Sequence, residues 1–444
     1  MSRALLVTAA LAAALPARAQ DALSLGEAIA RALASHPSIA AVEASREEAE
    51  ARVVQARSGW LPRVDVAEAW QRGNQPVYAF GTLLTQRRFT EAHFAIDALN
   101  RPDPLTNHRF SVSVQQPIFD GLFTAAAVRG ARAGVQAAVE QTALASHELA
   151  LGVTAAFGQA IRAQAEGAAA ISAVTAAGED LKRVQARRDA GLATEADVLA
   201  VQVHLAETRA RQTYASGQER TARAQLNELI GAPLEASYVL SVGPPTDLST
   251  DDSAALQREA LSARPDARLA ALQVRAAEAS LAMTRAAWLP QAGFQSAWEF
   301  NGGSFGERAS SWIVGAEVRF NVFRGGADRA RVAEAEAAIR RQQRERDRAE
   351  QRVRLDVVTA LAQLEAARAR AAVGREAKAQ ATESQRIVRD RYEAGLEDVT
   401  SLLRAAQAVQ QADALDIASR IDVVIATASL ERALGRLPRP TGGQ

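Results

Sequence analysis

The amino-acid sequence carries one pattern twice, and this repetition restricts its possible folds more than any other feature. Short motifs spread over the first half return in the same order in the second half. The matching pairs are WLP at 60–62 and 288–290, IFDG at 118–121 with VFRG at 322–325, AGL at 190–192 and 394–396, and LNELIG at 226–231 with LERALG at 430–435. A repeat of this size indicates that one structural unit of roughly two hundred residues was duplicated.

Each half contains one very long stretch with the pattern of an α-helix. Residues 124–189 and 327–391 lack proline, and apolar side chains recur at steps of three and four, as at Leu149, Val153 and Phe157. At 1.5 Å per residue each helix is roughly 95–100 Å long. Such a helix must pack against neighbours along its length, because an isolated helix gains little stability in water.

Between a shorter and a longer helix in each half, the apolar period changes to two. This alternation predicts two β-hairpins, at about 62–119 and 290–322, whose strands have the length that crosses a tilted bilayer. The first hairpin is longer by a polar and aromatic loop at about 72–107. Four strands cannot close a membrane barrel, and open edges in lipid leave backbone groups without partners. Strands in a membrane therefore require an oligomer, and three chains would supply about twelve strands.

Aromatic residues stand where such a barrel would meet the membrane interface. Trp60 and Trp288 precede the two hairpins, and Phe119, Phe123 and Phe323 follow them. The alternative is a small sheet in water that caps a coiled coil, since alternation is a weak signal for any single strand.

The N-terminus predicts export. Residues 1–19 have the charge, the apolar run and the small-residue cleavage site of a secretory signal peptide. No later stretch is long and apolar enough for a transmembrane helix. The expected divisions after the signal peptide are a first repeat at 20–231, a connector at 232–252, a second repeat at 253–435 and a C-terminal tail at 436–444.

Composition and motifs argue against an enzyme. The net charge is +1, which gives no reason to expect a nucleic-acid partner, and the absence of cysteine excludes thiol catalysis and thiolate metal sites. The five histidines are scattered without the spacing of metal ligands, and nothing resembles a phosphate loop or a nucleophile elbow. We therefore expect no catalytic residues, no cofactor and no metal.

Taken together, these features resemble the TolC-like outer membrane efflux protein family over essentially the whole mature chain. The resemblance lies in the duplicated helix–hairpin–helix–turn–helix order, the WLP motifs, FDG at 119–121, and the turns RDAGL at 188–192 and YEAGL at 392–396. Each motif alone is loose, but their order and their duplication are specific.

The resemblance implies a mainly α fold with a membrane β-barrel portion. Long antiparallel helices would form a periplasmic tunnel, and a homotrimer would build a twelve-stranded barrel in the outer membrane of a Gram-negative bacterium. The implied partners are a periplasmic adaptor (membrane fusion protein), an inner-membrane transporter and outer-membrane lipid. The implied function is that of a passive exit duct in a tripartite efflux or secretion system.

The family's glycine turns lie at the tunnel tip where adaptors dock. The resemblance therefore implies that Gly191, Leu192, Gly395 and Leu396 contact the adaptor.

Acidic residues just past these turns often line the tip aperture in the family. Asp197 matches that position, whereas Ser401 and Arg404 occupy the corresponding region of the second half. We hypothesise that a hydrogen bond between Tyr392 and Asp197 holds the tip closed.

Two questions stay open at the level of sequence. The cargo is either small molecules and metal ions or unfolded proteins of type I secretion, because the pump rather than the tunnel selects it. A different class of function, a periplasmic structural coiled coil without a channel, also fits the helical pattern.

Overall fold

The computed structural model describes residues 22–241 and 252–437 and divides into two units. The first comprises Met1–Ala41, Ala143–Arg264 and Arg352–Gln444, and the second comprises Val42–Thr142 and Pro265–Gln351. Each unit thus combines segments from both sequence repeats. The predicted signal peptide at 1–19, most of the connector and the end of the C-terminal tail lie outside the described residues.

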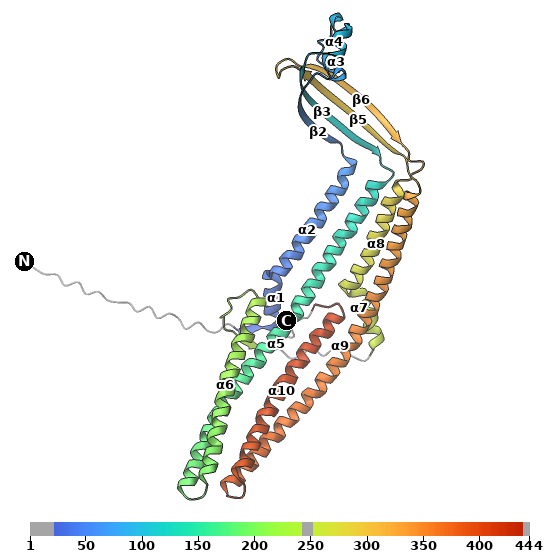
Figure 1. Ribbon diagram of the computed structural model, residues 1–444. Coiled ribbons are helices and arrows are strands. Elements are labelled where there is room, and N and C mark those ends of the chain that lie inside the picture. The colour runs from blue at the N-terminus through green and yellow to red at the C-terminus, as the bar shows by residue number, and fades with distance from the viewer. Residues whose placement is uncertain (1–21, 242–251, 438–444) are drawn as a thin grey trace, which may run out of the picture. The chain divides into compact units, whose positions relative to one another are not determined.

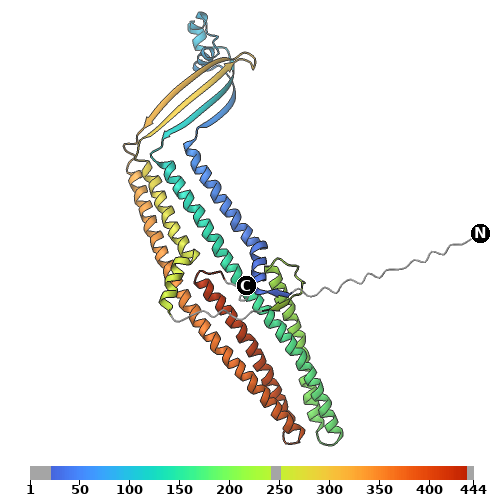
Figure 2. The same ribbon diagram turned by 180° about the vertical axis from the view of Figure 1, so that it is seen from behind.

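The second unit contains a four-stranded antiparallel sheet in the order β2-β3-β5-β6 (Figure 1, Figure 2). Its strands are β2 (Arg63–Gly73), β3 (Leu105–Phe119), β5 (Gln291–Gly302) and β6 (Ala309–Arg319). The two predicted hairpins therefore join through the pairing of β3 with β5, which brings the two repeats into one sheet.

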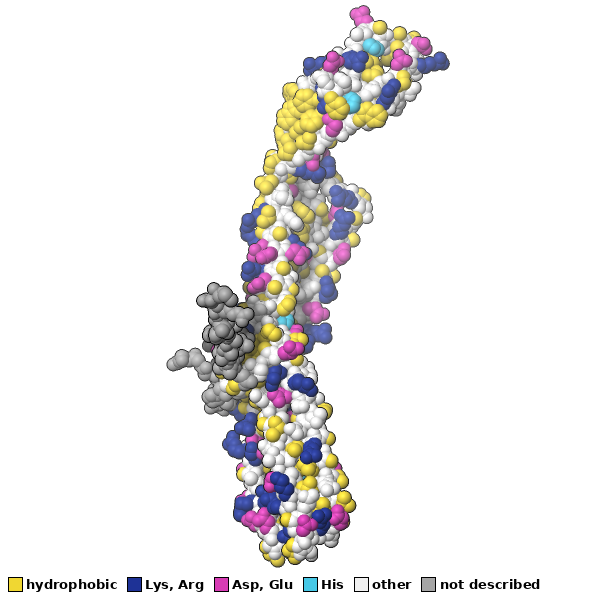
Figure 3. All heavy atoms as spheres, turned by 90° about the vertical axis from the view of Figure 1, so that its left-hand side faces the viewer, with side chains coloured by type: hydrophobic (Ala, Val, Ile, Leu, Met, Phe, Trp, Pro, Cys, Tyr) yellow, Lys and Arg dark blue, Asp and Glu magenta, His cyan; other side chains and the backbone are white. Residues whose placement is uncertain are grey.

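The register sorts the side chains onto one apolar and one polar face, because successive residues of a strand point to opposite sides. The apolar face carries Val64, Val66, Trp70, Val112, Trp298, Trp312, Val314 and Val318. The polar face carries Asp65, Ser111, Ser113, Gln295, Glu299 and Glu317. Figure 3 shows a patch of hydrophobic side chains on the sheet, close to where it joins the helices. Most of the large apolar side chains on the apolar face are exposed in a single chain.

The long segment between β2 and β3 differs from the predicted loop, because it folds into three short helices. These are α3 (Pro76–Thr85), the 3-10 helix η2 (Glu91–Phe94) and α4 (Ile96–Asn100). Pro76 starts α3 at the first helical position, where its missing N–H costs nothing. Phe89 packs edge-on against Phe80 and Phe94, with ring centroids 4.9 and 5.0 Å apart. These rings give the segment, here called the hairpin insertion (residues 74–104), a small core of its own.

The two repeats produce long helices of equal length. Both α5 and α9 have 67 residues, and both α6 and α10 have 35. The helices other than those of the insertion are α1 (Leu25–Ser35), α2 (Pro37–Arg57), η1 (Ser58–Trp60), α5 (Phe123–Asp189), α6 (Glu195–Leu229), α7 (Ser253–Ala263), α8 (Pro265–Ala286), α9 (Ala327–Glu393) and α10 (Val399–Ala433). None of the described helices is apolar enough over a sufficient length to span a membrane. The predicted long helices at 124–189 and 327–391 are confirmed to within two residues at each end.

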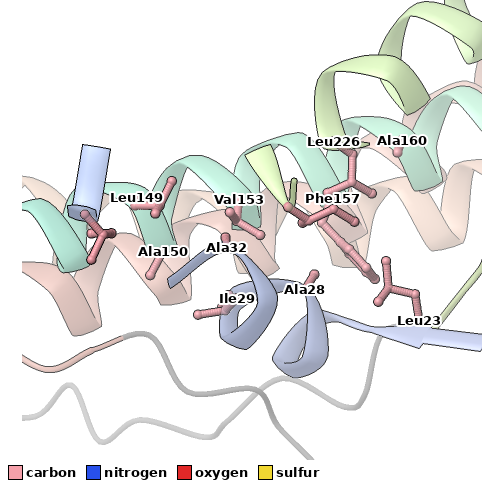
Figure 4. Close-up of a cluster of buried hydrophobic side chains, with 12 residues drawn as sticks. Leu23, Ala28, Ile29, Ala32, Leu149, Ala150, Val153, Phe157, Ala160 and Leu226 are labelled. Carbon is pink, nitrogen blue, oxygen red and sulfur yellow. The ribbon is translucent and has the colours of Figure 1, made fainter. Parts of the chain in front are cut away.

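The first unit has its main core where α1 meets α5 and α6. Figure 4 shows Ala28, Ile29 and Ala32 of α1 beside Val153 and Phe157 of α5. The start of α1 is fixed by a reciprocal cap, and the strands β1 (Ala22–Ser24) and β4 (Val239–Ser241) pair in parallel next to it. This core anchors the α5–α6 hairpin, one of the two helical hairpins whose turns form the candidate site.

Candidate functional site

Two turns with the same geometry end the first unit, one between α5 and α6 and one between α9 and α10 (Figure 1, Figure 2). Gly191 and Gly395 have φ angles of +75° and +78°, a left-handed conformation that favours glycine. In each turn the leucine N–H donates to a carbonyl five residues earlier, Leu192 to Arg187 at 2.8 Å and Leu396 to Arg391 at 2.9 Å. This is the Schellman arrangement, which satisfies carbonyls at a helix end.

Both return helices start with a side-chain cap, but the carboxylate stands at different positions. At α6, Thr194 is the N-cap, and Asp197 accepts hydrogen bonds of 2.8 Å from both the backbone N–H and the hydroxyl of Thr194. At α10, Asp398 is the N-cap and accepts from the Ser401 backbone N–H at 2.7 Å. The hydrogen bond from Ser401 holds the pKa of the Asp398 carboxyl below its usual value. The carboxylate missing at Ser401 is therefore supplied three residues earlier, at the same helix N-terminus.

Arg187 joins the two turns, which the sequence interpretation missed. Its Nη1 donates to the backbone carbonyls of Tyr392 and Glu393 at 3.1 and 3.2 Å. Its guanidinium carbon also lies 4.9 Å from the centroid of the Tyr392 ring. A cation here is favourable because these carbonyls end α9 and carry partial negative charge. The only hint in the sequence is that Arg391 occupies the equivalent position in the second turn.

Tyr392 belongs to a hydrophobic cluster from all four helices, here called the tip cluster. Its buried members are Val184, Val198, Val201, Tyr392, Val399 and Leu402. Burial raises the pKa of the Tyr392 phenol, so the ring stays neutral at physiological pH. The expected hydrogen bond between Tyr392 and Asp197 is not formed among the described residues of one chain. Asp197 is engaged in its own helix cap, and Arg404 is exposed to solvent.

A cavity of about 420 Å³ lies between the same four helices, farther from the turns. Small alanine side chains line much of it, together with the buried residues Asp180 and His204. Arg211 of α6 donates to Gln410 of α10 at 3.0 Å, which ties the two helical hairpins together a second time. Burial lowers the pKa of His204, so its imidazole is neutral near pH 7. In the described part of the chain no group of His, Asp and Glu side chains is arranged to hold a metal.

The predicted interface aromatics lie together at one end of the sheet in the second unit. Trp60 and Trp288 come directly before β2 and β5, and Phe119, Phe123 and Phe323 lie at or just beyond the ends of β3 and β6. All five side chains are at least 41% exposed in a single chain. That these side chains lie at the membrane interface stays a prediction.

Comparison with known proteins gives relatives along nearly the whole chain. The family model described as outer membrane efflux protein matches residues 28–232 and 256–436. Protein CyaE of Bordetella pertussis is 28% identical over 396 residues, which cover 88% of this chain and 79% of that protein.

Solved structures share the fold at low identity. The CmeC outer membrane channel of Campylobacter jejuni has a TM-score of 0.79 at 15% identity, covering 94% of this chain and 87% of that one. The outer membrane protein VceC of Vibrio cholerae has a TM-score of 0.74 at 17% identity, covering 93% and 96%. The open MtrE outer membrane channel of Neisseria gonorrhoeae has a TM-score of 0.73 at 17% identity, covering 95% and 91%.

Proposed function

Because the chain belongs to the outer membrane efflux protein family, we propose that it is the passive exit duct of a tripartite efflux or secretion system. It is an outer-membrane channel that extends into the periplasm, and its family is not enzymatic. This membership decides against a periplasmic coiled coil without a channel. In the proposed system an inner-membrane transporter supplies the energy and selects the cargo, small molecules or proteins, and a periplasmic adaptor connects the transporter to this chain.

The duct is a homotrimer. One chain supplies a sheet of four strands, in which β2 and β6 are edges with unpaired backbone groups. Such edges are not stable in lipid, so they pair with the edges of neighbouring copies. Three copies with the apolar faces outward give a closed sheet of twelve strands that presents Trp70, Trp298 and Trp312 to lipid and the polar face to the channel.

The observation that carries the proposed docking is the pair of matching exposed turns. Leu192 and Leu396 are each 68% exposed, although a leucine at this position of a Schellman turn commonly packs back on its own helix. Two identical apolar projections, each held by a glycine and a capped helix, form a rigid surface for adaptor helices. Gly191 and Gly395 set the direction of each projection.

The contact between the α5–α6 and α9–α10 hairpins holds the tip of the duct closed. Separation of the α5–α6 hairpin from the α9–α10 hairpin breaks the bonds from Arg187 and exposes Tyr392 of the tip cluster. Asp197 and Ser401 lie on the first turns of the return helices and Arg404 on the second turn of α10, where they line the aperture between copies.

Site-specific photo-crosslinking from position 396 in living cells tests this function. A photoreactive residue in place of Leu396 should capture a periplasmic adaptor, identified by mass spectrometry. The matched control is the same residue at Phe305, which is 70% exposed but lies in the β5–β6 loop. Capture of only neighbouring copies of this chain from position 396 would show that the turns are plain helix ends, while the trimer would stand.

A further inference from the structure

The hairpin insertion is attached to the end of the sheet that lies away from the long helices. Helix α3 contacts three of the four strands, β3, β5 and β6. Gln86, just after α3, donates to the Thr106 carbonyl at 2.8 Å and to Asn107 Oδ1 at 3.0 Å. Asn107 in turn donates to Asn301 Oδ1 at 2.9 Å, and Arg87 donates to the Ser310 carbonyl at 2.9 Å.

The side-chain amides of Gln86, Asn107 and Asn301 form a buried hydrogen-bonded network. Gln86, Asn107 and Asn301 are only 6%, 6% and 2% exposed. Buried amides are stable only when they are hydrogen-bonded, and a bonded network fixes one geometry. The insertion is therefore a fixed part of the sheet's end.

The insertion lies on the polar face of the sheet. Asn107 and Asn301 point to the same side as Ser111, Ser113 and Glu299, because they are separated from them by even numbers of residues within their strands. The β5–β6 loop lies against the opposite, apolar face. There the Phe305 ring is 4.4 Å from the His108 ring, and Arg308 pairs with Glu68 at 2.8 Å.

Resting on the proposed trimer, this placement has a geometric consequence. Three sheets that close with their polar faces inward carry all three insertions on the channel side. Twelve strands spaced about 4.8 Å apart and tilted by about 40° give a backbone radius of roughly 12 Å. Three touching helices of about 10 Å diameter need a circle of roughly 11 Å radius. Three copies of α3 at this rim therefore have no room to avoid one another.

The insertion also exposes the side chains that such a contact would bury. Val77, Phe94 and Ile96 are 78%, 64% and 79% exposed in the single chain. On the channel side these side chains are out of reach of membrane lipid, and the molecules that face them are the other two copies. We propose that the insertions of three copies meet through these side chains and form a cap over the outer mouth of the channel.

Disulfide crosslinking tests the cap directly, because the chain has no cysteine of its own. The variant Ile96→Cys, oxidised in intact outer membranes, should form disulfide-linked dimers and leave one of every three copies unpaired. The control variant Phe305→Cys lies on the outward face and should stay monomeric on a non-reducing gel. Native mass spectrometry of the same samples counts the copies in each complex.

The possible outcomes distinguish a failure of the proposed cap from a failure of the proposed trimeric duct. The cap is overturned, and the duct stands, if the protein is trimeric but Ile96→Cys forms no more disulfide-linked dimers than Phe305→Cys. A protein that is not trimeric overturns both. As a second measurement, replacing residues 76–100 by a short glycine–serine turn should raise single-channel conductance, and an unchanged conductance would also overturn the cap.

Discussion

Replacing Arg187 with methionine should make the tip open more readily. The substitution keeps most of the side-chain length but removes two hydrogen bonds from a charged donor and one contact with the Tyr392 ring. Hydrogen bonds to charged groups contribute about 1.5–3 kcal/mol each, and a cation over an aromatic ring about 0.5–1 kcal/mol. Arg187 is only half-buried, so water replaces part of the loss. A net loss of about 2 kcal/mol corresponds to a roughly thirtyfold shift toward separated hairpins.

Single-channel recording in a planar bilayer measures this shift as an increase in the open fraction of the channel. The matched control is Arg391→Met, the equivalent residue of the second turn, which pairs with Glu397 at 3.4 Å and is 55% exposed. Exposed ion pairs contribute about 0–1 kcal/mol, so this control should leave the open fraction unchanged. If Arg187→Met folds normally and its channel opens no more often than that of the wild type, the Arg187 bonds between the two turns do not keep the tip closed.

Three further predictions follow from the first unit. Phe157→Ala should lower the free energy of unfolding by about 3–5 kcal/mol, since the ring is 1% exposed; a loss below about 1 kcal/mol in urea unfolding would contradict the packing described. Gly395→Ala should cost about 1–2 kcal/mol because alanine is strained at φ +78°, and it should also weaken adaptor capture from position 396; unchanged melting and capture would contradict this. For His204, burial lowers the folded-state pKa below 6.5, so the unfolded chain takes up the proton first and stability falls as the pH drops below about 6.5. Between pH 7.5 and 5 the melting temperature should fall less in His204→Gln than in the wild type. An equal fall in both proteins would show that His204 does not contribute to the loss of stability in acid.

The long helices and the strands could be predicted because each is encoded by local periodicity. A proline-free stretch of 67 residues favours one continuous helix, and the glycine that follows it ends the helix in the left-handed conformation that glycine tolerates, as at Gly191 and Gly395. The alternation of apolar and polar residues likewise determined which side chains share a face of the sheet.

Contacts between distant segments could not be predicted in this way. Arg187 binds a carbonyl 205 residues further along the chain, and no periodicity of the sequence around this arginine reveals such a partner. The helices of the hairpin insertion are short, and their stability comes from the Phe89 ring contacts and from the bonds that Gln86 donates to Thr106 and Asn107 of β3. The cap at Asp398 was not predicted because the family pattern places the carboxylate at the position of Ser401, whereas a carboxylate at either position can satisfy the helix N-terminus.

The most direct test of the central claim is native mass spectrometry of the protein extracted from outer membranes in detergent. We expect one dominant species with the mass of three processed chains, because the two open edges of a four-stranded sheet require partners. A dominant monomer, or a complex with another number of copies, would contradict the duct proposed for this chain.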